Sequence, residues 1–189
     1  MWGFLQDLFS HLCGQSLAHS WSPGGELLPC CQRCTGVYLG ALSAALLHLA
    51  KPPSPTSFWR WLNGVFLLFM IPAGFHWLPQ GPGLRFASGL LFGAGLVAFL
   101  WLPLAKHPLP DADLKNAPVR LGVFFLTLLL MLVGTPQLGA SNLASAGTVL
   151  TLGTAGGALA LALLVVLHLC LLAGELVRWF FPPAPRAVA

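Results

Sequence analysis

Hydrophobic residues run through the chain in long stretches, which short segments rich in Pro, Gly and polar residues separate. A transmembrane helix needs about 20 mostly apolar residues. The stretches that approach or exceed this length are 34–50, 59–78, 84–104, 119–138 and 143–179. The first can begin a turn earlier, and the last is too long for one straight span, so its start is expected to be tilted or interfacial. The pattern predicts an all-α fold, a polytopic transmembrane helix bundle of about five spans.

Proline-rich breaks divide the chain. Segments 51–55, 79–83 and 107–113 combine Pro with Gly or charged residues, which end helices and form turns. We therefore expect a Cys- and His-rich N-terminal segment at 1–33, a helix bundle at 34–181 and a Pro-rich tail at 182–189.

The composition agrees with burial in a membrane. The chain is 57% hydrophobic and only 7% charged, whereas soluble domains carry about 25% charged residues. The lipid bilayer is therefore the expected partner. The nine Lys and Arg are scattered singly, which argues against nucleic-acid binding. Whether the chain forms a homo-oligomer or joins a membrane partner stays open.

The basic residues predict an orientation. With five spans, one face of the membrane holds two of the nine basic residues, and the other face holds seven. The two are Arg33 and Arg85; the seven are Lys51, Arg60, Lys106, Lys115, Arg120, Arg178 and Arg186. The positive-inside rule places the richer face in the cytoplasm. The N-terminal segment is then outside and the C-terminus is cytoplasmic.

Pairs of small residues recur at four-residue spacing within the predicted spans. Such pairs let helix backbones approach closely in lipid, and we interpret them as packing positions. They are Gly36 and Gly40, Gly89 and Gly93, and Gly153 and Gly157.

Four of the five cysteines precede or begin the first span. Cys31 and Cys34 form a Cys-x-x-Cys, a spacing that can chelate a metal or close a redox-active disulfide. Arg33 between them, and a helix beginning there, would favour thiolates in either case. Cys30 can belong to this site or pack as a small hydrophobe, and Cys170 is expected to pack in the last span.

Further donors favour a metal. Cys13 lies near His11 and His19, and three thiolates with one imidazole would complete a four-coordinate zinc site. We predict Cys13, Cys31, Cys34 and His19 as the ligands. The turn between the second and third spans lies on the same face and adds His76, Gln80 and Arg85 as candidate site residues. We expect His48, near the opposite edge, to be solvated.

The chain resembles a family of small prokaryotic membrane proteins catalogued as domain of unknown function 2085. Its pattern is Cys-His-Gln, an Arg-Ser pair, Pro-x-Cys-x-Arg-Cys-Thr-Gly-Ile-Tyr-x-Gly and, further on, Pro-x-x-x-Asp-Gly-x-x-Gln followed by Arg-x-x-x-Gly-x-x-x-Gly. The matching residues are Cys13, Gln15, Ser20, Pro29, Cys31, Arg33, Cys34, Thr35, Gly36, Tyr38, Gly40, Pro72, Gln80, Arg85, Gly89 and Gly93. The resemblance implies a prokaryotic inner or cell membrane protein with a Cys-rich outer site, adds Gln15 and Tyr38 as site candidates and supplies no activity.

The chain departs from that pattern at four positions. Gly14 stands in place of the family's His, His19 in place of Arg, His76 in place of Asp and Trp77 in place of Gly. If the family His is a ligand, it is lost here, and His11 or His19 would have to replace it.

Three functions remain open. The first is a membrane protein with a Cys/His metal site. The second is a thiol–disulfide oxidoreductase in which Cys31 and Cys34 cycle and Cys13 or Cys30 exchanges, an arrangement similar to that of the quinone-coupled disulfide oxidases. The third is a disulfide-stabilised scaffold or partner subunit, which an oxidising outer compartment would favour.

Overall fold

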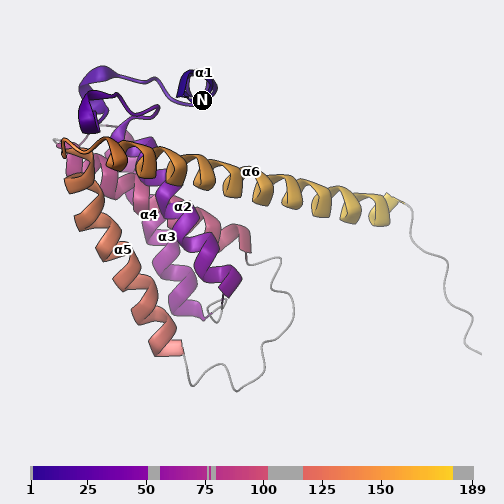
Figure 1. The fold of residues 1–189 in the computed structure, drawn as a ribbon. Helices are drawn as coiled ribbons and strands as arrows, with labels where there is room; N and C mark the ends of the chain where they lie inside the picture. Colours follow the sequence, from indigo (N-terminus) through magenta and orange to yellow (C-terminus); the bar gives the residue numbers. More distant parts are fainter. Residues whose placement is uncertain (1, 51–55, 76, 78–79, 102–116, 181–189) are drawn as a thin grey trace, which may run out of the picture.

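The computed structural model describes residues 2–50, 56–75, 77, 80–101 and 117–180, and over these residues the fold is entirely helical (Figure 1). The helices are α1 (Trp2–Ser10), α2 (Gln32–Ala50), α3 (Ser57–Gly74), α4 (Pro82–Trp101), α5 (Ala117–Gly139) and α6 (Ala144–Phe180). Two short 3₁₀ turns, η1 (Leu17–His19) and η2 (Pro23–Gly25), lie between α1 and α2. The predicted all-α bundle is confirmed.

Within the described residues, the structure has one candidate span fewer than the five predicted. Four helices are long and apolar enough to cross a membrane: α2, α4, the segment Pro118–Gly139 of α5, and α6. Helix α3 forms where the sequence predicted it and packs against α4, with the Cβ position of Gly95 3.2 Å from Phe66 Cβ. It is not one of the four, because Arg60 and Asn63 in its first two turns make it less apolar.

Helices α2 and α4 meet backbone to backbone at the centre of the bundle. A Cβ on Gly36 or Gly40 would overlap a carbonyl oxygen of α4, and a Cβ on Gly89 or Gly93 would overlap a carbonyl oxygen of α2. The two predicted pairs therefore face each other in one contact, which we call the glycine seam. Close approach of this kind needs residues without side chains.

The third pair packs α6 onto α2. A Cβ on Gly157 would overlap the carbonyl oxygen of Tyr38, and one on Gly153 would lie 2.8 Å from Leu39 Cδ2. The three predicted pairs are thus confirmed as helix-packing positions.

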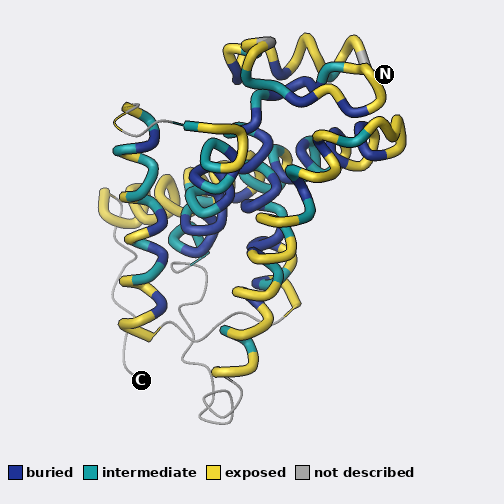
Figure 2. Tube along the Cα trace, turned by 90° about the vertical axis from the view of Figure 1, so that its left-hand side faces the viewer, coloured by how far each residue is buried: buried dark blue, intermediate teal, exposed yellow. Residues whose placement is uncertain are grey.

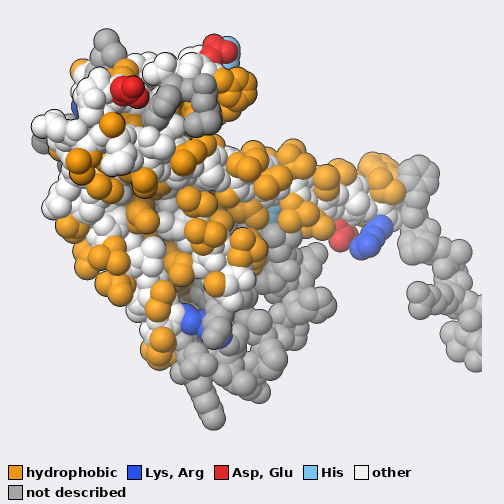
Figure 3. Space-filling model, viewed as in Figure 1, with side chains coloured by type: hydrophobic (Ala, Val, Ile, Leu, Met, Phe, Trp, Pro, Cys, Tyr) orange, Lys and Arg blue, Asp and Glu red, His pale blue; other side chains and the backbone are white. Residues whose placement is uncertain are grey.

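Helix α6 is longer than the bundle is wide. Its 37 residues correspond to about 55 Å of helix, so the expectation that it is too long for one straight span is confirmed. Its buried residues lie between Ala146 and Leu164. The remainder extends past the other helices and is exposed (Figures 1 and 2), and the visible face of the helix is largely hydrophobic (Figure 3).

Two expectations about single side chains are wrong. Cys170 is exposed, because it lies on the part of α6 beyond the bundle. His48 is buried, with its ring 6.1 Å from that of Trp59 and 5.4 Å from that of Trp101. His48 lies on the face of α2 that meets neighbouring helices, where aromatic rings enclose it.

The N-terminal segment folds over one end of the bundle, where α2, α4 and α6 begin (Figure 1). The Gly24 N–H donates to the Ser141 carbonyl at 3.2 Å, and Trp21 packs against Phe86 with ring centroids 5.5 Å apart. This segment is therefore a folded cap attached to the α5–α6 turn and to α4.

Candidate metal centre

Three cysteine side chains meet beneath this cap. Cys31 immediately precedes α2, and Cys34 lies in the first turn of the helix. The Thr35 N–H donates to the Cys31 carbonyl at 2.9 Å, so Cys31 already takes part in the helical hydrogen bonding. Cys13 follows α1, and its N–H donates to the Phe9 carbonyl at 2.8 Å. The Cys-x-x-Cys spacing thus becomes one helical turn, to which the cap adds a third thiol.

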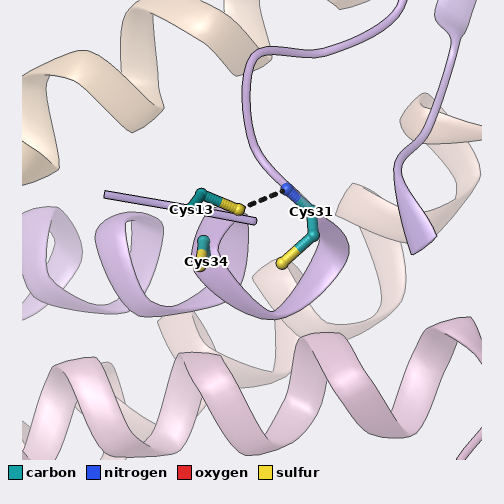
Figure 4. Close-up of side chains that lie close together, drawn as sticks. All are labelled: Cys13, Cys31 and Cys34. Atoms are coloured by element: carbon teal, nitrogen blue, oxygen red, sulfur yellow. Dashed lines mark hydrogen bonds between the residues drawn. The ribbon is translucent and has the colours of Figure 1, made fainter. Parts of the chain in front are cut away.

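The three sulfurs form a compact group. The Sγ atoms of Cys13, Cys31 and Cys34 all lie within 4.8 Å of one another (Figure 4). Zinc–sulfur bonds of about 2.3 Å at tetrahedral angles place sulfurs about 3.8 Å apart. The Cys31 backbone N–H donates to Cys13 Sγ at 3.3 Å, a contact that stabilises negative charge on that sulfur. Small movements would therefore suffice for these three sulfurs to bind one ion.

The thiols of the cluster differ in the direction of their pKa shifts. Hydrogen bonds from the thiols of Cys30, Cys31 and Cys34 hold the pKa of Cys13 far below its usual range, despite the opposing effect of burial. The hydrogen bond to Cys13, followed by burial, raises the pKa of Cys30 well above its usual range. These opposite pKa directions favour loss of the proton from Cys13 and retention of the proton on Cys30.

Cys30 combines the two roles that the sequence left open. It is only 1% exposed and packs with Phe9 and Cys13 in a small apolar cluster. Its thiol also hydrogen-bonds to Cys13. Cys30 is nevertheless outside the group of three mutually close sulfurs.

A cavity of about 310 Å³ adjoins the three sulfurs. Its lining consists of Leu12, Cys13, Gly14, Gln15, Ser16, His19, Cys31, Arg33, Cys34 and Arg85. His19, the predicted fourth ligand, thus lines the same cavity as the sulfurs without belonging to their close group. His11 is exposed, and His76 lies outside the described residues.

The predicted convergence of two segments is found at Arg33. Its guanidinium donates to the Ala73 carbonyl at 2.9 Å and to Gln80 Oε1, and the Gln80 amide donates to the same carbonyl. The end of α3 and Gln80, two residues before α4, therefore hold Arg33 in place beside the cysteines. Arg85, in the first turn of α4, lines the cavity with it.

Gln15 and Tyr38 support the site from outside the sulfur group. The Gln15 amide donates to the carbonyls of Gln6 and Pro29 at 2.8 and 2.9 Å, which ties the Cys13 loop to the start of α2. Gln15 has a positive φ of 40°, a conformation that costs energy in most non-glycine residues. The Tyr38 ring packs on Phe9 with centroids 5.6 Å apart and so holds α1 over the site.

The sequence did not indicate three features of this site. They are the Ala73 carbonyl that orients Arg33, the cover provided by Phe9, and the hydrogen bond from Cys30 to Cys13. A backbone carbonyl has no residue-type signal. The apolar residues of α1, which include Phe9, could have indicated the cover. His168 and Glu175 lie on α6, away from these cysteines, and Glu175 contacts Arg178 at 3.5 Å.

Comparison with known proteins extends this description. A family model described as "Predicted membrane protein (DUF2085)" matches residues 13–99, which run from the first clustered cysteine to the last turn of α4. A curated relative from Methanothermobacter thermautotrophicus, named only as an uncharacterized protein, is 34% identical over 95 residues, covering 47% of this chain and 83% of the relative. No solved structure matches.

Proposed function

Because the chain belongs to the family of predicted membrane proteins DUF2085, we propose that it is a multi-pass membrane protein that binds one zinc-like ion at one face of the bilayer. The ligands would be the thiolates of Cys13, Cys31 and Cys34. The observation that carries the proposal is the mutual approach of their sulfurs to within 4.8 Å.

The surroundings of Cys13 suit a metal ligand. A thiol must lose its proton to bind a metal, and the pKa of Cys13 is already held low by its hydrogen bonds. The Cys31 N–H also donates to this sulfur at 3.3 Å. Both interactions favour the thiolate form before any ion arrives. His19 remains our candidate for the fourth ligand, since it lines the cavity beside the sulfurs.

A membrane thiol–disulfide oxidoreductase is the second candidate. A thiolate at Cys13 beside two further thiols favours it, because the thiolate is the attacking species in disulfide exchange. Exchange with a quinone would call for an apolar cleft beside Cys31 or Cys34. The adjoining cavity instead has Arg33, Arg85 and Gln15 in its lining, which supports the metal proposal over this alternative.

The site is proposed to face the outside. Arg33 and Arg85 lie at the cysteine end, whereas Arg60 and Arg120 lie in the first turns of α3 and α5 at the opposite end (Figure 1). By the five-span expectation from the sequence, Arg60 and Arg120 belong to the face with seven of the nine basic residues, and the positive-inside rule assigns that face to the cytoplasm.

Elemental analysis with thiol counting on detergent-purified protein tests the proposal. We expect about one zinc per chain in the wild type and a large loss in Cys31→Ser. Cys170→Ser is the matched control, because it makes the same change at an exposed cysteine of α6, and it should keep the metal.

A wild type without metal, in which two thiols appear only after reduction, would contradict the metal proposal. A quinone-reduction assay would then separate the oxidoreductase from a disulfide-stabilised scaffold. In metal-containing protein, His19→Ala tests the fourth ligand, and an unchanged zinc affinity would remove His19 from the set.

A further inference from the structure

The cavity beside the cysteines contains two arginines from different helices. Arg33 belongs to the first turn of α2 and Arg85 to the first turn of α4. The glycine seam joins these two turns, since a Cβ on Gly89 would overlap the Arg33 carbonyl oxygen. The two guanidinium-bearing positions are therefore fixed relative to each other by backbone packing.

Among the residues that the structure describes, no carboxylate lines this cavity. Over the part of the chain that the structure describes, neither Arg33 nor Arg85 forms an ion pair. The acidic residues of the cap, Asp7 and Glu26, are both exposed and lie outside the lining. Arg33 is oriented by neutral acceptors, the Ala73 carbonyl and Gln80, and its Nε atom is buried without a hydrogen-bond partner.

We propose that this cavity binds a phosphate group, held by the guanidinium groups of Arg33 and Arg85 beside the cysteine cluster. Arginine presents its N–H donors in a planar fork that matches phosphate oxygens. The Gln15, Ser16 and His19 side chains in the lining can supply further polar contacts. The site does not depend on the proposed metal, because arginines rather than sulfurs provide its charge.

The position of the cavity allows two sources of phosphate. Its arginines lie in the first turns of the spanning helices α2 and α4, which begin at the same end of the bundle (Figure 1), so a free phosphate could enter from water and a phospholipid headgroup from the bilayer. The chemistry recognised is the same in both cases.

Calorimetric titration of inorganic phosphate into full-length protein, purified in an uncharged detergent without phospholipid, tests the free anion. Native mass spectrometry of protein from nanodiscs of phosphatidylcholine, with and without phosphatidylglycerol, tests the lipid. Arg85→Gln should weaken binding about tenfold or more, as expected for loss of a charge-assisted contact, and Arg85→Lys should lose less. Arg60→Gln is the control with the same charge change at an exposed position in α3.

Binding of inorganic phosphate that depends on Arg85 supports the site with the free anion as its source. Selective retention of phosphatidylglycerol that depends on Arg85 supports it with the headgroup as its source. The proposal is overturned if neither probe binds, or if Arg85→Gln binds as well as the wild type. Zinc content measured on the same samples shows separately whether the metal proposal holds, since Arg85→Gln should keep the metal.

Discussion

Replacing Gly89 by alanine should separate the two central helices and disturb the cysteine site. The added Cβ would overlap the Arg33 carbonyl oxygen and lie 3.0 Å from both the Arg33 carbonyl carbon and the Val37 nitrogen. All three are backbone atoms, so no side-chain rotation can relieve the contact. The α2 turn that carries Arg33 and Cys34 must move instead.

The magnitude follows from two opposing effects. Overpacking of this kind costs roughly 1–3 kcal/mol, and contact with rigid backbone puts Gly89→Ala near the upper limit. Alanine returns about 1 kcal/mol through its better helix propensity, which leaves a net loss of about 2 kcal/mol. Gly174 in α6 has nothing within 4 Å of its Cβ position, and Gly174→Ala should gain up to about 1 kcal/mol.

The two variants should differ by about 3 kcal/mol in unfolding free energy, or roughly 6–12 °C in unfolding temperature for a chain of this size. Thermal unfolding in detergent, followed by tryptophan fluorescence, measures this difference, and zinc content reports the site. If Gly89→Ala were as stable as Gly174→Ala and kept its metal, the close packing of α2 and α4 at this position would be refuted.

Two further predictions concern the thiols. The stability of metal-free protein should rise between about pH 6 and pH 8.5, because the pKa of Cys13 is lowered on folding and the unfolded chain binds the extra proton in that range. At higher pH the raised pKa of Cys30 should reverse the trend, since the unfolded chain loses that proton first. Unfolding temperature against pH measures both effects, and a flat profile for the wild type, or an unchanged slope in Cys13→Ser, would contradict the first. Cys30→Ala should keep its zinc because Cys30 lies outside the three-sulfur group; loss of the metal as complete as in Cys31→Ser would make Cys30 a ligand.

The helix positions could largely be predicted from the sequence, because hydrophobic length and proline breaks determine them locally. Helix α2 begins at Gln32, two residues before the predicted stretch at 34–50, and α5 and α6 end within two residues of their predicted limits. Helix α3 ends at Gly74 rather than at residue 78. Its polar first turns lower its hydropathy without changing its packing in the bundle.

Neighbour relations were harder to predict, because hydropathy does not state which face of a helix meets another helix. The expectations for His48 and Cys170 were wrong for this reason. His48 points between aromatic rings, and Cys170 lies beyond the bundle. The glycine pairs were informative because two small residues at four-residue spacing let helix backbones approach closely in lipid, whereas a single glycine such as Gly174 has nothing within 4 Å of its Cβ position.

The part of the candidate site whose residues are close together in the sequence was predictable. Cys31 and Cys34 lie one helical turn apart, so their approach follows from spacing alone. Cys13 is eighteen residues before Cys31, and its place depends on the fold of the cap, including the hydrogen bonds of Gln15. The partners of Arg33 depend on how α3 ends, which residue types alone do not determine.

The glycine seam also determines which parts of this site can move. Backbones in direct contact have no rotamers to exchange, so α2 and α4 can respond to a bound ion or anion only as one rigid body. Cys34 and the two arginines belong to that body, and the Thr35 N–H joins Cys31 to it. Cys13 belongs to the cap and is tied to the residues just before α2, because the Gln15 amide donates to the Pro29 carbonyl and the Cys31 N–H donates to Cys13 Sγ. Binding of an ion or anion would therefore move the cap on the membrane surface, while the spanning helices keep their relative positions.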